Sequence, residues 1–80
     1  MQVMEIKVSF FGPIKRPWPE QSRKIEVEEG INIRKLLHIL GYGESDIRRV
    51  ATVINGKKVS LGTQIQAGAD VRFVLLAGGG

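Results

Sequence analysis

Cysteine is absent from this sequence of 80 residues, and histidine occurs only once, at His38. Without thiols the chain can form no disulfide, no thiolate nucleophile and no cysteine-ligated metal site. A single imidazole also argues against a histidine-rich metal centre or a Ser–His catalytic pair. Aromatic residues make up only 6% of the chain, which is few for a surface that stacks several nucleic-acid bases. We therefore expect neither catalytic side chains nor a bound metal.

Long apolar runs are missing as well. No stretch approaches the ~20 residues of a membrane-spanning helix, and the start, MQVMEIKVSF, alternates in polarity instead of resembling a signal peptide. These features predict a cytoplasmic protein without a membrane partner. The formal net charge of +4 permits binding to nucleic acid or to an acidic protein. Its lysines and arginines are spread along the chain, however, and form no basic arm.

The first half of the chain predicts two strands and a helix. Polarity alternates over residues 3–10 and 23–28, which indicates half-buried strands separated by a proline-rich loop. The stretch INIRKLLHILG then has apolar residues at helical spacing. Asn32 is a suitable N-cap and Gly41 a suitable residue just past the end, so we expect a helix over about 33–40.

The second half predicts a hairpin and a final strand. Asn55 and Gly56 are the strongest short hairpin signal, because a type I′ turn needs a positive φ at both central positions. They should join a strand over 50–54 to one over 57–61. After a loop, renewed alternation predicts the last strand over 70–76.

This order of elements predicts an α+β fold, with one main helix on one face of a mixed sheet. A crossover by the helix gives a β-grasp, or ubiquitin-like, roll. We expect a single domain over residues 1–76 and a flexible glycine tail over 77–80, with Trp18 as a packing cover on the first loop. The expected core is Met4, Ile6, Val8, Ile25, Val27, Ile33, Leu36, Leu37, Leu40, Val53, Leu61, Ile65, Val71 and Phe73.

The last strand carries apolar residues on both faces. Arg72, Val74 and Leu76 are predicted to point away from the core. Two outward apolar side chains next to the chain end suggest a docking patch, on which Arg72 orients an acidic partner. Ordinary sheet surface is the alternative reading of the same two side chains.

Three segments resemble the ThiS/MoaD family of ubiquitin-like sulfur carriers. INIRKLLHILG is similar to the family's T-x-x-x-L-L-x-x-L-G, and ATVINGKKV is similar to x-V-x-V-N-G-x-x-V. IQAGADVRFVLLAGGG resembles the family's C-terminal segment, which ends in glycines. The order and spacing of the three segments, rather than any one of them, carry the resemblance.

The resemblance implies a reaction at the C-terminal carboxylate of Gly80. A partner similar to ubiquitin-activating enzymes would adenylate it with ATP, and a sulfur donor would then convert it to a thiocarboxylate. A sulfur-acceptor synthase subunit would receive the sulfur for thiamin or molybdopterin synthesis, or the sulfur would serve tRNA thiolation. Gly78 and Gly79 have no Cβ and could thread a narrow channel to that site. The chain would then be a carrier without a tightly bound cofactor, and the ATP would be used by its partner.

Two other functions stay open at this point. A ubiquitin-like protein modifier would use the same activated glycine end. A β-grasp RNA-binding module would suit the basic pI of about 9.9. The scattered cations and the few aromatic residues argue against nucleic acid as a partner.

Overall fold

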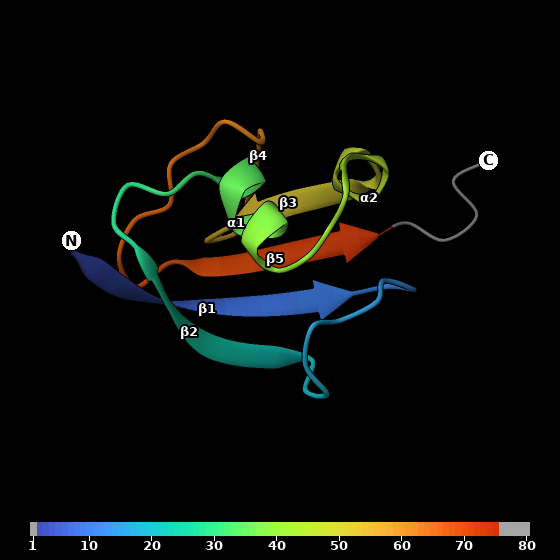
Figure 1. The fold of residues 1–80 in the computed structure, drawn as a ribbon, viewed down its shortest axis with the longest axis horizontal. Helices are drawn as coiled ribbons and strands as arrows, with labels where there is room; N and C mark the ends of the chain where they lie inside the picture. Colours follow the sequence, from blue (N-terminus) through green and yellow to red (C-terminus); the bar gives the residue numbers. More distant parts are fainter. Residues whose placement is uncertain (1, 76–80) are drawn as a thin grey trace.

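Five strands form one mixed sheet in the part of the chain that the computed structural model describes, residues 2–75. The sheet order is β2-β1-β5-β3-β4, and helices α1 and α2 lie over one of its faces (Figure 1). This is the predicted α+β, β-grasp arrangement. The elements are β1 (Val3–Phe11), β2 (Ser22–Glu28), α1 (Ile33–Ile39), α2 (Glu44–Arg49), β3 (Val50–Ile54), β4 (Lys57–Val59) and β5 (Asp70–Leu75).

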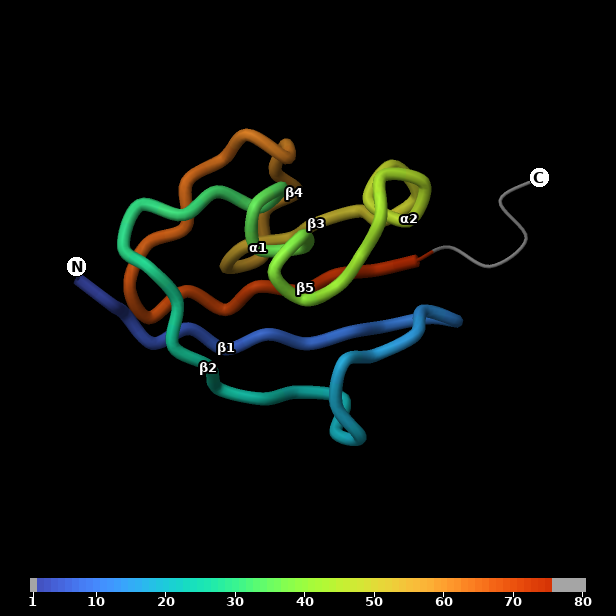
Figure 2. The backbone as a smooth tube through the Cα atoms, viewed as in Figure 1, coloured from blue at the N-terminus to red at the C-terminus, as the bar shows by residue number. Residues whose placement is uncertain are grey.

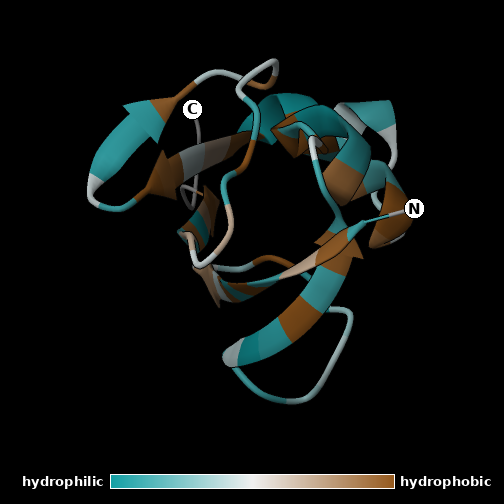
Figure 3. Cartoon of the chain, turned by 90° about the vertical axis from the view of Figure 1, so that its left-hand side faces the viewer, coloured by the Kyte–Doolittle hydropathy of each residue, from teal (hydrophilic) through white to brown (hydrophobic). Residues whose placement is uncertain are grey.

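The core lies between the helices and the two central strands, β1 and β5. These strands come from opposite ends of the chain and run side by side in parallel (Figure 2). Val8 lies opposite Val71 and Phe10 opposite Phe73, and all four side chains are at most 2% exposed. Brown and teal bands along the strands in Figure 3 show the alternation of apolar and polar residues that makes this face hydrophobic.

Helix α1 has an N-cap, an apolar stripe and a terminating glycine, which together predict the same helix. The Asn32 side chain accepts a hydrogen bond from the backbone N–H of Lys35 at 2.8 Å, as an N-cap does. Beyond the helix, Gly41 has a φ of +98°, which a residue with a side chain rarely adopts. The buried residues of the helix are Ile33, Leu36 and Leu37. The prediction of this helix is confirmed to within one residue at its end.

Helix α2 corrects the prediction of a single helix, because the sequence predicts only a connection between the helix over about 33–40 and the strand over 50–54. Ile47 is its one buried residue, so the segment has no apolar stripe from which a helix can be predicted. Glu44 and Asp46 in the first turn and two arginines in the last turn complement the helix dipole. A helix this short depends on packing against the rest of the fold. Within residues 2–75, no helix is long and apolar enough to cross a membrane.

Strand β3 corrects the predicted core. Val53 lies opposite Arg72 on the outer face of the sheet, whereas Thr52 lies opposite Phe73 and is 2% exposed. The stretch VATVI is apolar at four of five positions, so alternation does not determine which face is buried. Pairing with β5 decides it, since a shift of one residue would exchange the two faces. Strand β4 is also shorter than predicted and ends at Val59.

The rest of the predicted core is largely confirmed. Trp18, predicted to cover the first loop, is buried against Phe10 with the ring centroids 5.6 Å apart. Three predicted core residues are only partly buried at its edge, namely Ile25, Leu40 and Leu61. The core also contains residues absent from the predicted set: Phe10, Trp18, Ile31, Tyr42, Ile47, Val50 and Ala69.

A small ion cluster joins the two helices. The Arg34 guanidinium donates to a Glu44 carboxylate oxygen at 2.7 Å, and His38 Nε2 lies 3.2 Å from the other oxygen. The hydrogen bond from Arg34 is the main reason why the pKa of Glu44 lies below its usual range. The cluster is solvent-exposed, so its contribution to stability is small.

Glu44→Gln tests this cluster through pH. A carboxyl whose pKa falls on folding contributes stability above its unfolded pKa, and this contribution is lost as pH drops through the folded pKa. We expect the variant to melt less than about 4 °C below the wild type at neutral pH. The two should coincide at about pH 2. Thermal unfolding at both pH values, with Glu29→Gln as an exposed control, checks this. A deficit that persists in acid would contradict it.

Candidate functional site

The end of strand β5 is the part of the fold to which the predicted site belongs. Leu75 is the last described residue, and it lies opposite Val50 of β3. Strand β5 sits between β1 and β3, and Val74, one residue before Leu75, is paired on both sides. The last described part of the strand is therefore held within the sheet. The remaining predicted site residues, Leu76, Gly78, Gly79 and Gly80, lie outside the described residues.

An apolar patch surrounds the outer side of this strand end. Val74 lies between Phe11 of β1 and Ala51 of β3. Val53 lies on the same face, two residues after Ala51 along β3, and it is opposite Arg72 of β5. We call Phe11, Ala51, Val53 and Val74 the outer patch; each of its residues is partly exposed. The sequence predicted only Val74 of this group. Ala51 and Val53 carry no such signal, because the stretch VATVI is apolar at four of five positions and only its pairing with β5 shows which residues face outward.

Cations flank the outer patch. Arg72 and Lys58 lie on either side of Val53 in adjacent strands. The Arg72 side chain is 53% exposed, and its guanidinium donates to an Asp70 carboxylate oxygen at 3.3 Å. An ion pair this exposed is weak. The Arg72 guanidinium can therefore release the Asp70 carboxylate and bind an acidic group of a partner instead. The structure thus places Arg72 beside Val74 at the surface, as the sequence predicts.

Gly12 brings the first loop onto the end of β5. Its φ is +88°, and a Cβ built there would lie 2.0 Å from the carbonyl oxygen of Leu75. Only glycine avoids both the backbone strain and the overlap. Figure 2 shows this loop at the same end of the sheet as the end of β5. The loop therefore forms a wall beside Leu75, the last described residue of β5.

Gly12→Ala is expected to destabilise the protein by at least about 2 kcal/mol, because the left-handed backbone and the contact with Leu75 both oppose a side chain. Chemical denaturation measures the change. Gly62→Ala is the matched control, since a Cβ there would meet no atom within 4 Å. Equal stability of the two variants would contradict the close approach of Gly12 to β5.

The first loop is anchored at two points. Trp18 packs its indole ring against Phe10, and the Tyr42 hydroxyl donates a hydrogen bond to the backbone carbonyl of Lys15. Burial, together with the negative charge of Asp46, raises the pKa of Tyr42 to about 12. The hydroxyl therefore stays protonated and keeps donating at physiological pH. Prolines in the loop restrict it further, so its shape is set before any partner binds.

Sequence comparison identifies the chain. The model of the ThiS family matches residues 8–80. The chain belongs to the ThiS family. The match covers the outer patch, the first loop and the glycine tail, and it confirms the resemblance seen in the sequence motifs. No curated protein matches the chain by sequence.

Solved structures show where else this ThiS-family fold occurs. A protein described as molybdopterin converting factor, subunit 1, from Pyrococcus furiosus matches with a TM-score of 0.71 at 19% identity, covering 90% of this chain and 97% of that one. SAMP1 from Haloferax volcanii matches with a TM-score of 0.73 at 15% identity, covering 95% and 99%. These two likenesses establish the ubiquitin-like β-grasp fold.

A third solved structure contains a partner. It is a complex of subunits 1 and 2 of the molybdopterin-converting factor from Helicobacter pylori, with a TM-score of 0.62 at 25% identity. The match covers 96% of this chain and 100% of the matched chain. The structural relatives of this ThiS-family chain thus include a protein held in a two-subunit complex.

No metal-binding group is visible in this ThiS-family chain within residues 2–75. No three or more His, Asp or Glu side chains there converge so that they could hold an ion. The features that the structure does bring together at the end of β5 are an apolar patch, flanking cations and an anchored loop. Such features suit protein docking.

Proposed function

We propose that this ThiS-family protein is a sulfur carrier whose reacting group is the terminal carboxylate of Gly80. The observation that carries the proposal is the position of the glycine tail in a ThiS-family chain. In the sequence the tail comes two residues after Leu75, the end of the central strand, in which Val74 is paired on both sides. A rigid strand end can present the tail to another protein's active site. The carrier itself is non-catalytic and acts as a substrate.

The proposed reaction has two steps. The carboxylate oxygen attacks the α-phosphorus of ATP, which releases pyrophosphate and leaves an acyl-adenylate. A sulfur donor at the oxidation level of sulfide then attacks the acyl carbon, and AMP departs to leave a thiocarboxylate. The partner enzyme binds the ATP, so the carrier needs no cofactor of its own. Glycine keeps the acyl carbon unhindered for both attacks.

Two kinds of partner follow from this reaction. One is an adenylating enzyme of the ubiquitin-activating class, and the other is a synthase subunit that accepts the sulfur. The H. pylori complex of two converting-factor subunits supports the second. Arg72, Val74 and Leu76 are the proposed docking residues, and the rest of the outer patch extends that surface. We place the reaction in the cytoplasm, and the product pathway is cofactor synthesis (thiamin or molybdopterin) or tRNA thiolation.

Intact mass spectrometry of the protein purified from its own cells tests the proposal. A thiocarboxylate increases the mass by one exchange of oxygen for sulfur. Deletion of Gly79 and Gly80 should remove the increase. A mass that stays that of the plain acid, even after incubation with ATP, the adenylating enzyme and a sulfur donor, would overturn the carrier function.

Two further measurements separate the alternatives. A protein modifier would instead be found joined to lysine side chains of other proteins through its terminal carboxylate, and the likeness to a solved structure described as H. volcanii small archaeal modifier protein 1 makes this the second candidate. An RNA-binding module would bind single-stranded RNA with an affinity that falls steeply with salt and does not depend on Gly79 and Gly80.

A further inference from the structure

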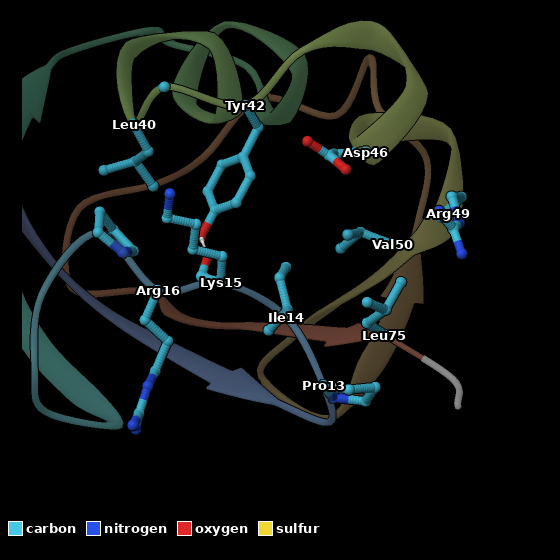
Figure 4. Close-up of a pocket in the computed structure, with 12 residues that line it drawn as sticks. Pro13, Ile14, Lys15, Arg16, Leu40, Tyr42, Asp46, Arg49, Val50 and Leu75 are labelled. Atoms are coloured by element: carbon cyan, nitrogen blue, oxygen red, sulfur yellow. Dashed lines mark hydrogen bonds between the residues drawn. The ribbon is translucent and has the colours of Figure 1, made fainter. Parts of the chain in front are cut away.

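A groove lies beside the end of β5, on the side of the sheet that carries the helices (Figure 4). Three separate segments form its walls: the first loop over 13–17, the connection over 40–42 between the helices, and residues 46–50 of α2 and β3. Leu75 closes one end, and the volume is about 560 Å³. The groove thus adjoins the point where the chain continues toward its glycine tail.

The groove is built in advance of any occupant. The hydrogen bond from Tyr42 to the Lys15 carbonyl joins the first loop to the connection between the helices, across the groove floor (Figure 4). The packing of Trp18 on Phe10 holds the other end of the loop. A surface that is already ordered loses little conformational entropy on binding, which favours recognition of a partner segment.

The floor and the rim of the groove differ in chemistry. Four of the lining residues are aliphatic, and we call these four the floor: Ile14, Leu40, Val50 and Leu75. Lys15 and Arg16 lie on one side and Arg49 on the other, and all three are exposed (Figure 4). The single acidic side chain is Asp46, whose carboxylate is directed into the groove. Three cations against one anion make the rim positive.

We propose that this groove receives an extended acidic segment of the adenylating partner. An apolar side chain of that segment would fill the aliphatic floor, and its carboxylates would bind Lys15, Arg16 and Arg49. Asp46 would accept a backbone N–H of the segment. The inference rests on the proposed function, because the groove is lined by Leu75, which lies five residues before the proposed reacting carboxylate of Gly80. It adds a second contact area to the outer patch, on the opposite side of the sheet.

Nucleic acid is the less suitable occupant. Stacking of bases requires exposed aromatic faces, but the groove floor is aliphatic. Tyr42 contributes a buried ring whose hydroxyl is already engaged. The carboxylates of an acidic peptide segment bind the cations equally well, and an apolar side chain of the same segment matches the aliphatic floor.

Arg49→Glu and Arg48→Glu form a matched pair for the test. Both residues are exposed and lie in the last turn of α2, so reversal of either charge has the same effect on the helix dipole. Only Arg49 lines the groove. The assay is ATP–pyrophosphate exchange by the purified adenylating enzyme, measured against the concentration of the carrier. We expect Arg49→Glu to raise the KM for the carrier about tenfold at unchanged kcat, and Arg48→Glu to change it less than about twofold.

A second pair of variants and a salt series complete the test. Lys15→Glu combined with Arg16→Glu should raise KM in the same way, and Lys35→Glu on α1 should not. The KM of the wild type should rise more steeply with salt than that of Arg49→Glu. Thermal unfolding establishes that each variant is folded.

Each other outcome is informative. Equal KM values for the Arg49 and Arg48 variants would overturn the groove proposal and leave the carrier function intact. A lower KM for Arg49→Glu would show that the groove holds the chain's own carboxylate, and this too would overturn it. Loss of salt-dependent binding to a single-stranded oligoribonucleotide, at unchanged KM, would make the groove an RNA site instead. Absence of exchange with the wild type would overturn the proposed function itself.

Discussion

Replacing Gly79 by valine is expected to lower the rate of ATP-dependent activation by about 100-fold or more. In the proposed reaction the carboxylate is one residue away, and the adenylating enzyme has to hold it in line with the α-phosphorus of ATP. A β-branched side chain would add bulk to the tail that this enzyme has to admit, and it removes the backbone conformations that only glycine adopts freely. A displacement of the carboxylate by about 1 Å is enough to produce a loss of this size.

The measurement is ATP–pyrophosphate exchange with separate determination of kcat and KM. Gly62→Val is the matched control, because it makes the same change in a loop after β4 where a Cβ would meet no atom within 4 Å. Its rate should equal that of the wild type. Gly79→Ala should fall between the two valine variants. If Gly79→Val is activated as fast as Gly62→Val, the terminal carboxylate is not the reacting group.

Val74→Asp is expected to raise the KM for the adenylating enzyme about 30-fold or more, as loss of a central interface residue does. Val74 lies in the middle of the outer patch, between Phe11 and Ala51, on the strand that leads to the tail. An aspartate there would be buried against apolar groups of the partner without a counter-charge, and burial of an unpaired charge is costly. The kcat should change less than KM, because the tail itself is intact.

Val3→Asp is the control for a charge on the same face of the sheet. Val3 is 56% exposed at the far end of β1, on the outer side, and the substitution should leave KM within about twofold of the wild type. Val74→Thr keeps the β-branched shape and the strand propensity, so it tests docking without risk to the fold. A normal KM for both Val74 variants would show that the outer patch is ordinary sheet surface.

Local signals were sufficient for part of this fold. Helix α1 was predictable because its N-cap Asn32, its apolar stripe and Gly41 all agree. The turn at Asn55 and Gly56 was predictable because both residues adopt a positive φ there, as the type I′ turn requires. In each case the residues that determine the structure are neighbours in sequence, so the pattern contains all the information needed.

Other features of the site have no local signature. Ala51 and Val53 belong to the outer patch only because β3 pairs with β5 in one register. The stretch that contains them is apolar on both faces, so alternation favours neither phase. Helix α2 has one buried residue and forms through tertiary packing. Gly12 is an ordinary loop glycine in the sequence, and its close approach to Leu75 is visible only in the folded chain.

The sequence by itself determined the main helix, the hairpin turn, the alternating central strands and the motifs of the ThiS family, including the glycine tail. Only the tertiary structure decided which side chains surround Val74 and that three distant segments form a groove beside Leu75. The physical reason is the distance along the sequence between the residues that determine each feature. Capping, turn geometry and periodicity depend on neighbouring residues, whereas strand register and groove formation depend on which distant segments pack together, and composition alone does not encode that choice.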